Sequence, residues 1–194
     1  MKITFDVCIQ NLAKYTEGIL IFKWVELPMD EEQLKNEVKE ILKSDEELMI
    51  ADYNTNFGYS VPEFENVFEL NKIAERIQEI VTEEEHLDVL KCCTGYSGMG
   101  TNEALKVLEE GNYRVWEGGN EQDLGETLVE EGNFAGYINY IPDTLKDYRY
   151  GKIRDYYAIV EIIKQLPLDY EAIGRTFTFS TSGCFEGDSY IEIW

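Results

Sequence analysis

The pattern of apolar and polar positions predicts a β-rich start to the chain. Residues 3–10, 19–27 and 47–53 each carry apolar side chains at alternate or continuous positions typical of strands. Asp30, a good N-cap residue with Gln33 three positions on, precedes apolar residues at helical spacing from Leu34 to Leu42. The first 60 residues therefore predict a β-β-α-β module.

The next stretch changes to helical spacing. Apolar residues from Leu70 to Ile80 recur every three or four positions, which predicts a helix with one buried face. Thr82 and Glu85 have the spacing of a capping box and predict a second, short helix. Thr101 is expected to cap a third helix that ends at Gly111. Residues 61–110 are thus predicted to form a helical middle unit.

The last part of the sequence predicts a mixture of strands and helices. A strand is expected at 113–117 and a helix over 121–131, closed by Gly132. Further helices are expected near 142–149 and 154–165, and closing strands at 175–180 and 189–194. Together the patterns predict an elongated α+β fold of three small consecutive units, 1–60, 61–110 and 111–194.

Charge changes this picture more than composition does. The chain has 39 acidic and 17 basic residues, for a net charge of −22. Residues 44–131 alone hold 22 acidic and 5 basic residues, net −17, against −2 before them and −3 after them. Such a balance argues against binding a nucleic acid or an anionic membrane, both of which attract basic patches. A basic partner surface is favoured instead.

Glutamates recur four apart within this acidic segment. Glu75, Glu79 and Glu83 step along one helix face by about 6 Å each, and Glu126, Glu130 and Glu131 crowd another predicted helix. Like charges four apart on a helix repel. Either these carboxylates form a solvated face with no further role, or a cationic partner meets them.

Catalytic and metal-binding patterns are weak in this sequence. His86 is the one histidine, and no GxSxG element or P-loop is present. Residues 52–63 resemble a calcium loop, but Phe57 stands where the loop needs glycine. "GYSGMG" lacks the lysine of a phosphate-binding loop. We therefore predict no enzyme activity, no catalytic residue, no metal and no cofactor.

The longest apolar stretch, "GILIFKWV", is too short to cross a bilayer. No basic region followed by an apolar segment marks a secretory signal. The sequence thus predicts a cytoplasmic protein.

Four elements in series, at residues 11–34, 50–77, 103–132 and 169–177, resemble those of the ArdA antirestriction proteins. "NLAKYTEGILIFKWVELPMDEEQL" is similar to the family's opening element, with Asn11, Leu12, Lys14, Tyr15, Glu17, Gly18, Trp24, Pro28 and Asp30 at the matching positions. The family's D-Y element and E-L-N helix match Asp52, Tyr53, Glu69, Leu70 and Asn71. "EALKVLEEGNYRVWEGGNEQDLGETLVEEG" is similar to its mid-chain helix, G-N-Y strand and acidic antirestriction segment, and residues 169–177, "DYEAIGRTF", to its closing element.

This resemblance spans about residues 7–192, with two departures. Thr176 and Phe177 stand where the family has Asp-Leu, and residues 145–167 look like an insertion or a rebuilt segment. Both departures lie in the C-terminal region, which forms the dimer in this family.

The resemblance implies a homodimer that mimics B-form DNA and occupies the DNA groove of type I restriction–modification enzymes. It would thereby block restriction, and could also block modification, of incoming DNA such as that of a mobile genetic element. The phosphate-mimicking surface would then comprise Glu75, Glu79, Glu83, Glu84, Glu85, Asp88, Glu109, Glu110, Glu117, Glu121, Asp123, Glu126, Glu130 and Glu131. The alternative is an acidic protein that inhibits another DNA-binding protein, such as a histone-like protein, a polymerase or a CRISPR effector.

Overall fold

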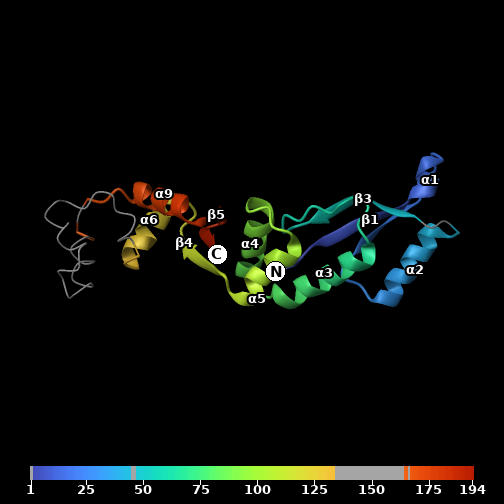
Figure 1. Cartoon of the computed structure of the whole chain (residues 1–194), viewed down its shortest axis with the longest axis horizontal. Helices are drawn as coiled ribbons and strands as arrows, with labels where there is room; N and C mark the ends of the chain where they lie inside the picture. The colour runs from blue at the N-terminus through green and yellow to red at the C-terminus, as the bar shows by residue number, and fades with distance from the viewer. Residues whose placement is uncertain (1, 45–46, 134–163, 166) are drawn as a thin grey trace. The chain divides into compact units, whose positions relative to one another are not determined.

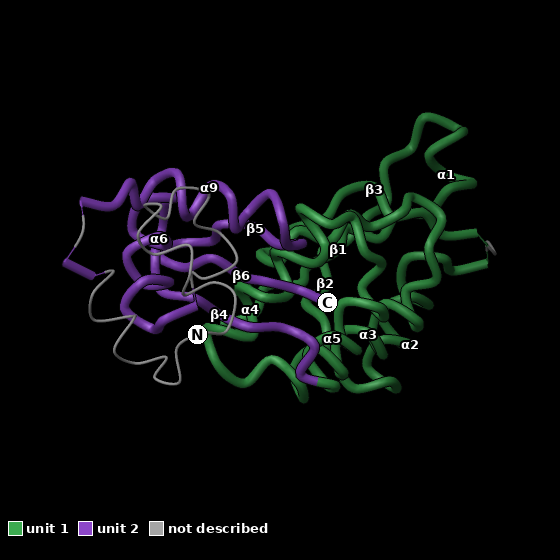
Figure 2. Tube along the Cα trace, turned by 60° about the vertical axis from the view of Figure 1, so that its left-hand side comes forward, with its two compact units in different colours: residues 1–110 green, residues 111–194 purple. Residues whose placement is uncertain are grey.

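The computed structural model describes residues 2–44, 47–133, 164–165 and 167–194. The chain divides into two compact units, residues 1–110 and residues 111–194, coloured separately in Figure 2. Each unit combines helices with a small antiparallel sheet, which confirms the predicted α+β class. The helix predicted at 142–149 lies outside the described residues, as do all of the helix predicted at 154–165 except its last two residues and most of the segment 145–167.

The sheet of the first unit contains the three predicted strands. They are β1 (Phe5–Asn11), β2 (Phe22–Glu26) and β3 (Leu48–Thr55), in the order β2-β1-β3. Both pairings are antiparallel. A short helix, α1 (Leu12–Thr16), follows β1, and it begins where the Asn11 side chain accepts a hydrogen bond from the Lys14 amide at 2.9 Å.

The helices of the first unit follow the predicted apolar stripes. They are α2 (Glu31–Leu42), α3 (Val67–Ile80), α4 (Glu84–Lys91), the π-helical turn η1 (Cys92–Tyr96) and α5 (Thr101–Glu110), as Figure 1 shows. Asp30 caps α2 as predicted, because its carboxylate accepts the amides of Glu32 and Gln33. The capping box predicted at Thr82 is wrong: α4 begins after Glu83, whose side chain makes no capping bond.

The β-rich and helical parts of this unit are tied together by hydrogen bonds. The side-chain amide of Asn71 on α3 accepts a hydrogen bond from the Met29 backbone N–H and donates one to the Met29 carbonyl, each at 2.9 Å. The Ile50 amide in β3 donates to the Glu63 carbonyl at 2.7 Å. The finer division at residue 61 stays a prediction.

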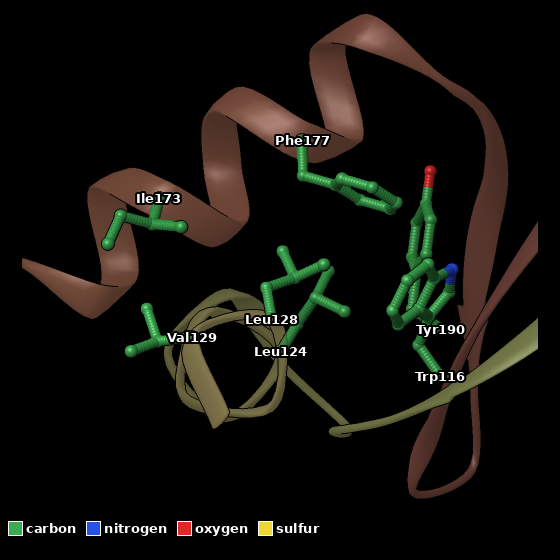
Figure 3. Close-up of a cluster of buried hydrophobic side chains, with 7 residues drawn as sticks. All are labelled: Trp116, Leu124, Leu128, Val129, Ile173, Phe177 and Tyr190. Carbon is green, nitrogen blue, oxygen red and sulfur yellow. The ribbon is translucent and has the colours of Figure 1, made fainter. Parts of the chain in front are cut away.

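The second unit contains β4 (Tyr113–Glu117), α6 (Glu121–Glu130), α9 (Tyr170–Ser180), β5 (Ser182–Glu186) and β6 (Ser189–Ile193). Its strands lie in the order β4-β6-β5 and all pairs are antiparallel. Figure 3 shows its core, in which Leu124 and Leu128 of α6 face Phe177 of α9, and the rings of Trp116 and Tyr190 lie beside that of Phe177. The predicted strands at 113–117 and 189–194 and the helix at 121–131 are confirmed within a residue or two.

The strand predicted at 175–180 is wrong, because these residues complete α9. Asp169 caps this helix by accepting the Ala172 amide at 3.0 Å. Ile173 and Phe177, four positions apart, are both buried against α6, so their helical spacing prevails over the alternating Thr-Phe-Thr-Phe pattern. The strand β5 comes after this segment and was not predicted.

Two glycines let α6 and α9 approach closely. A Cβ atom at Gly125 would lie 1.9 Å from the Tyr170 carbonyl oxygen, and one at Gly174 would lie 1.8 Å from that of Glu121. Each glycine therefore meets the backbone of the opposite helix. This contact fixes α6, which carries several of the predicted site residues, on the rest of its unit.

Candidate acidic interaction surface

The predicted carboxylates fall into two sets, one on each unit. The set on the first unit comprises Glu75, Glu79, Glu83, Glu84, Glu85, Asp88, Glu109 and Glu110, and that on the second comprises Glu117, Glu121, Asp123, Glu126, Glu130 and Glu131. Asp88 and Glu121 are partly buried and the others are exposed.

Helices α3 and α4 present the first set. Glu75 and Glu79 are exposed while Leu70, Ala74 and Ile77 bury the other face of α3. Glu84 and Glu85 lie in the first turn of α4. Carboxylates are favourable there because the helix macrodipole places partial positive charge at the N-terminus.

Cations neutralise part of this set. Arg76 on α3 reaches α5, where its guanidinium pairs with Glu109 at 3.1 Å and donates to Asn102 at 2.8 Å. Lys91 pairs with Asp88 at 2.8 Å within α4. These two pairs stabilise the local structure and reduce the charge that Glu109 and Asp88 offer to a partner.

The N-terminus of α6 is fixed by its cap. The Asn120 side chain accepts the amides of Gln122 and Asp123, at 3.0 and 3.1 Å. Leu124, Leu128 and Val129 then point into the core. This leaves the carboxylates of Asp123, Glu126 and Glu130 exposed.

At each end of α6, a different arginine pairs with a carboxylate. Near its N-terminus, Arg175 of α9 pairs with Glu121 at 3.0 Å and also with Glu171. After its last residue, Arg114 of β4 pairs with Glu131 at 2.7 Å. The Arg114 guanidinium also lies 3.6 Å from the centre of the Trp116 ring, a cation–π contact.

Sequence reasoning missed these two arginines. Arg175 and Glu171 are four apart on α9, a spacing that could have indicated their pair. Arg114 and Glu131 are 17 positions apart in the chain, and only the packing of β4 beside α6 brings them together. No local signal predicts that contact.

Most of the predicted carboxylates keep their charge uncompensated. Within the part of the chain that the structure describes, no ion pair involves Glu75, Glu79, Glu83, Glu84, Glu85, Glu117, Asp123, Glu126 or Glu130. Their hydrogen bonds are to neutral amides where they have any, as between Glu75 and Asn71 at 3.0 Å and Glu126 and Gln122 at 3.3 Å. The arrangement can attract a cationic surface.

Among the described residues, no group of three or more His, Cys, Asp or Glu side chains is placed to hold a metal ion. None of the described helices has the length and apolar character needed to span a membrane.

These features define an acidic α+β protein whose helices present carboxylates well in excess of cations. The family model described as Antirestriction protein (ArdA) matches residues 7–192. The chain therefore belongs to the ArdA family of antirestriction proteins, which confirms the resemblance found in the sequence. A search of curated proteins found no match.

Proposed function

We propose that this protein protects incoming DNA by mimicking a duplex and occupying the DNA-binding groove of a type I restriction–modification enzyme. The observation that carries the proposal is the set of exposed carboxylates on α3, α4 and α6 that have no cationic partner among the described residues. Family membership supplies the antirestriction role. The protein would act without catalysis, in the cytoplasm and on the methyltransferase core of the enzyme.

The amount of charge suits this role. A B-form duplex carries one phosphate charge per ~1.7 Å of its axis. A homodimer would carry twice −22 charges, which corresponds to roughly 75 Å of duplex at that density. This length is an upper bound because the net charge counts every carboxylate of the chain, including those that do not face the partner.

The spacing of the carboxylates also suits the proposed mimicry of a DNA duplex. Residues four apart on a helix are separated by about 6 Å along the axis, as are Glu75 and Glu79 on α3 and Glu126 and Glu130 on α6. Phosphates on one strand of a duplex advance by about 3.4 Å each. One carboxylate per helical turn therefore approximates every second phosphate of a strand.

Dimerisation through residues 111–194 is part of the proposal, as in the family. It would double the acidic surface and match the two-fold symmetry of many DNA sites. Size-exclusion chromatography with light scattering at micromolar concentration tests it, and a monomer there would contradict it.

Competition for a purified methyltransferase core tests the mimicry itself. We expect the protein to bind the core, to be displaced by excess duplex DNA, and to bind far more weakly as salt rises, because charge screening shortens to about 3 Å at 1 M. Binding that does not change with salt or with added DNA would contradict mimicry. If the core is not bound but a histone-like protein, polymerase or CRISPR effector is, the alternative acidic-inhibitor function replaces it.

Plasmid transformation measures the biological effect. The gene is expressed in hosts that differ only in their restriction system, and each host is transformed with unmodified plasmid. We expect restored transformation in hosts with a type I enzyme. Restoration that is equal in all hosts, including those without restriction, would count against an antirestriction role.

A further inference from the structure

A cluster of exposed apolar side chains lies at and just before β2, outside the acidic surface. Ile19 and Leu20 are 49% and 66% exposed, and Phe22 and Trp24 are 54% and 46% exposed. Contiguous exposed apolar side chains of this kind commonly mark a protein–protein contact. We call residues 19–26 the β2 edge; Figure 2 shows β2 beside β1 in the first unit.

The backbone of β2 is open on one side. Asn11 donates to the Ile21 carbonyl and Leu27 to the Phe5 carbonyl, so the odd-numbered residues of this strand bond to β1. The alternation of an antiparallel ladder then turns the N–H and C=O groups of Phe22, Trp24 and Glu26 away from β1. Within the described residues, β2 pairs with no strand except β1.

Charge around the β2 edge is nearly balanced. Lys23 pairs with Glu40 at 3.2 Å and with Glu37, and Glu26 pairs with Lys2 at 2.9 Å. Residues 1–43 hold 8 acidic and 6 basic residues, against 22 and 5 in residues 44–131.

This balance decides which partner fits the edge. A cationic partner is drawn to the acidic helices and gains nothing from a neutral edge. A second copy of the chain, at −22, is repelled by those helices and meets the least repulsion at the β2 edge, since screening limits charge effects to about 8 Å at physiological salt.

We propose that two copies of this chain associate through antiparallel pairing of their β2 strands, about a two-fold axis at Trp24. In this register Trp24 lies opposite Trp24 of the partner subunit, and Phe22 lies opposite Glu26 of the partner subunit. The outward-facing backbone groups of residues 22, 24 and 26 are then the ones that form the new ladder. The pairing joins two three-stranded sheets into one of six strands and places the exposed Trp24 side chain beside that of Trp24 of the partner subunit.

This contact is independent of the proposed DNA mimicry and of the dimer proposed through residues 111–194. If both contacts form, association continues beyond a dimer, because each two-fold contact uses a different surface of the chain. The β2 contact alone gives a dimer. In either case the β2 contact is detected as a concentration-dependent association step that depends on residue 24.

Opposite charges at residue 24 provide the test. Across the two-fold axis, Trp24→Lys places like charges directly opposite each other, as does Trp24→Glu, and each loses the aromatic contact. We expect sedimentation velocity of the full chain to show this step weakened roughly tenfold or more in either variant. An equimolar mixture of the two variants should recover it, because lysine then faces glutamate.

The matched control is Phe64→Lys, which changes an aromatic side chain that is 70% exposed in the first unit, between β3 and α3 and outside residues 111–194. It should leave the β2 step unchanged, and melting curves of all three variants verify that each is folded. Recovery in the mixture supports the pairing even if the single variants are less stable. Absence of the step in the wild-type chain, its persistence in Trp24→Lys, or failure of the mixture to recover it would overturn the proposal.

Discussion

Replacing Gly125 by alanine should strongly destabilise the second unit, although glycine-to-alanine changes within helices usually stabilise. The added Cβ would lie 1.9 Å from the Tyr170 carbonyl oxygen and 2.7 Å from its carbon. These are backbone atoms of α9, so no side-chain rotation relieves the overlap. The helices α6 and α9 have to separate.

The geometry sets the size of the effect. Ordinary contact begins at 3.4 Å, so the helices must move apart by 3.4 − 1.9 = 1.5 Å at this point. Overpacking of this kind typically costs about 1–3 kcal/mol, and the helix propensity of alanine offsets only about 0.5–1 kcal/mol. The displacement also loosens Leu124, Leu128 and Phe177, which are buried between the helices. We expect a net loss of about 2 kcal/mol, or a melting temperature lower by roughly 8–16 °C for a unit of this size.

Differential scanning calorimetry with near-ultraviolet circular dichroism measures this change. The buried aromatic side chains of the second unit, among them Trp116 and Phe177, contribute to this signal. Gln122→Ala, an exposed position on the same helix, is the matched control and should change the melting temperature by little. A Gly125→Ala protein that melts at or above the wild-type temperature would refute the close helix contact.

Three further predictions concern charge. Single changes of Glu126, Glu130 or Glu131 to glutamine should leave inhibition nearly intact, because each exposed ion pair contributes only about 0–1 kcal/mol; the triple variant should inhibit less while remaining folded. One single change that abolishes inhibition in a folded protein would indicate a specific site instead. Arg114→Gln frees Glu131 and should strengthen binding to a methyltransferase core at low salt, measured by titration calorimetry; weaker binding would mean that Arg114 matters for orienting the carboxylate. Burial raises the pKa of the Cys93 thiol from 9.0 to about 11. The folding stability gained by keeping this thiol neutral is therefore fully present below pH 9 and is lost as pH rises toward 11. Urea unfolding of wild type and Cys93→Ala should show a smaller alkaline loss in the variant, and equal losses would contradict this.

Local patterns were enough to place most elements of the fold. The strand at 113–117 follows from its own alternation, and α2 follows from Asp30 and the apolar stripe from Leu34 onward. These features depend on residues within one or two turns of each other. The same patterns misled at 175–180, where the alternating Thr-Phe sequence has the period of a strand. The burial of Phe177 against α6 is a tertiary contact, and it decides that segment.

The candidate acidic surface was also only partly predictable from local sequence. Exposure of Glu75, Glu79 and Glu126 follows from helix periodicity, because the apolar positions of their helices are buried. Which carboxylates remain uncompensated could not be predicted, since Arg114 reaches Glu131 from another element. That information lies in the packing of β4, α6 and α9 and not in any short stretch of sequence.

The same packing explains how α6 tolerates its acidic residues. Glu126 and Glu130, four apart, repel by only about 0.2–0.5 kcal/mol. A carboxylate at the C-terminus of a helix opposes the macrodipole, but there Glu131 is paired with Arg114. By contrast, burying a leucine side chain contributes about 1.5–3 kcal/mol, and both Leu124 and Leu128 are fully buried. Because core packing stabilises α6 by far more than its charges destabilise it, the exposed carboxylates are free to be selected for a partner. A basic groove that closes on them would then remove their repulsion at the moment of binding.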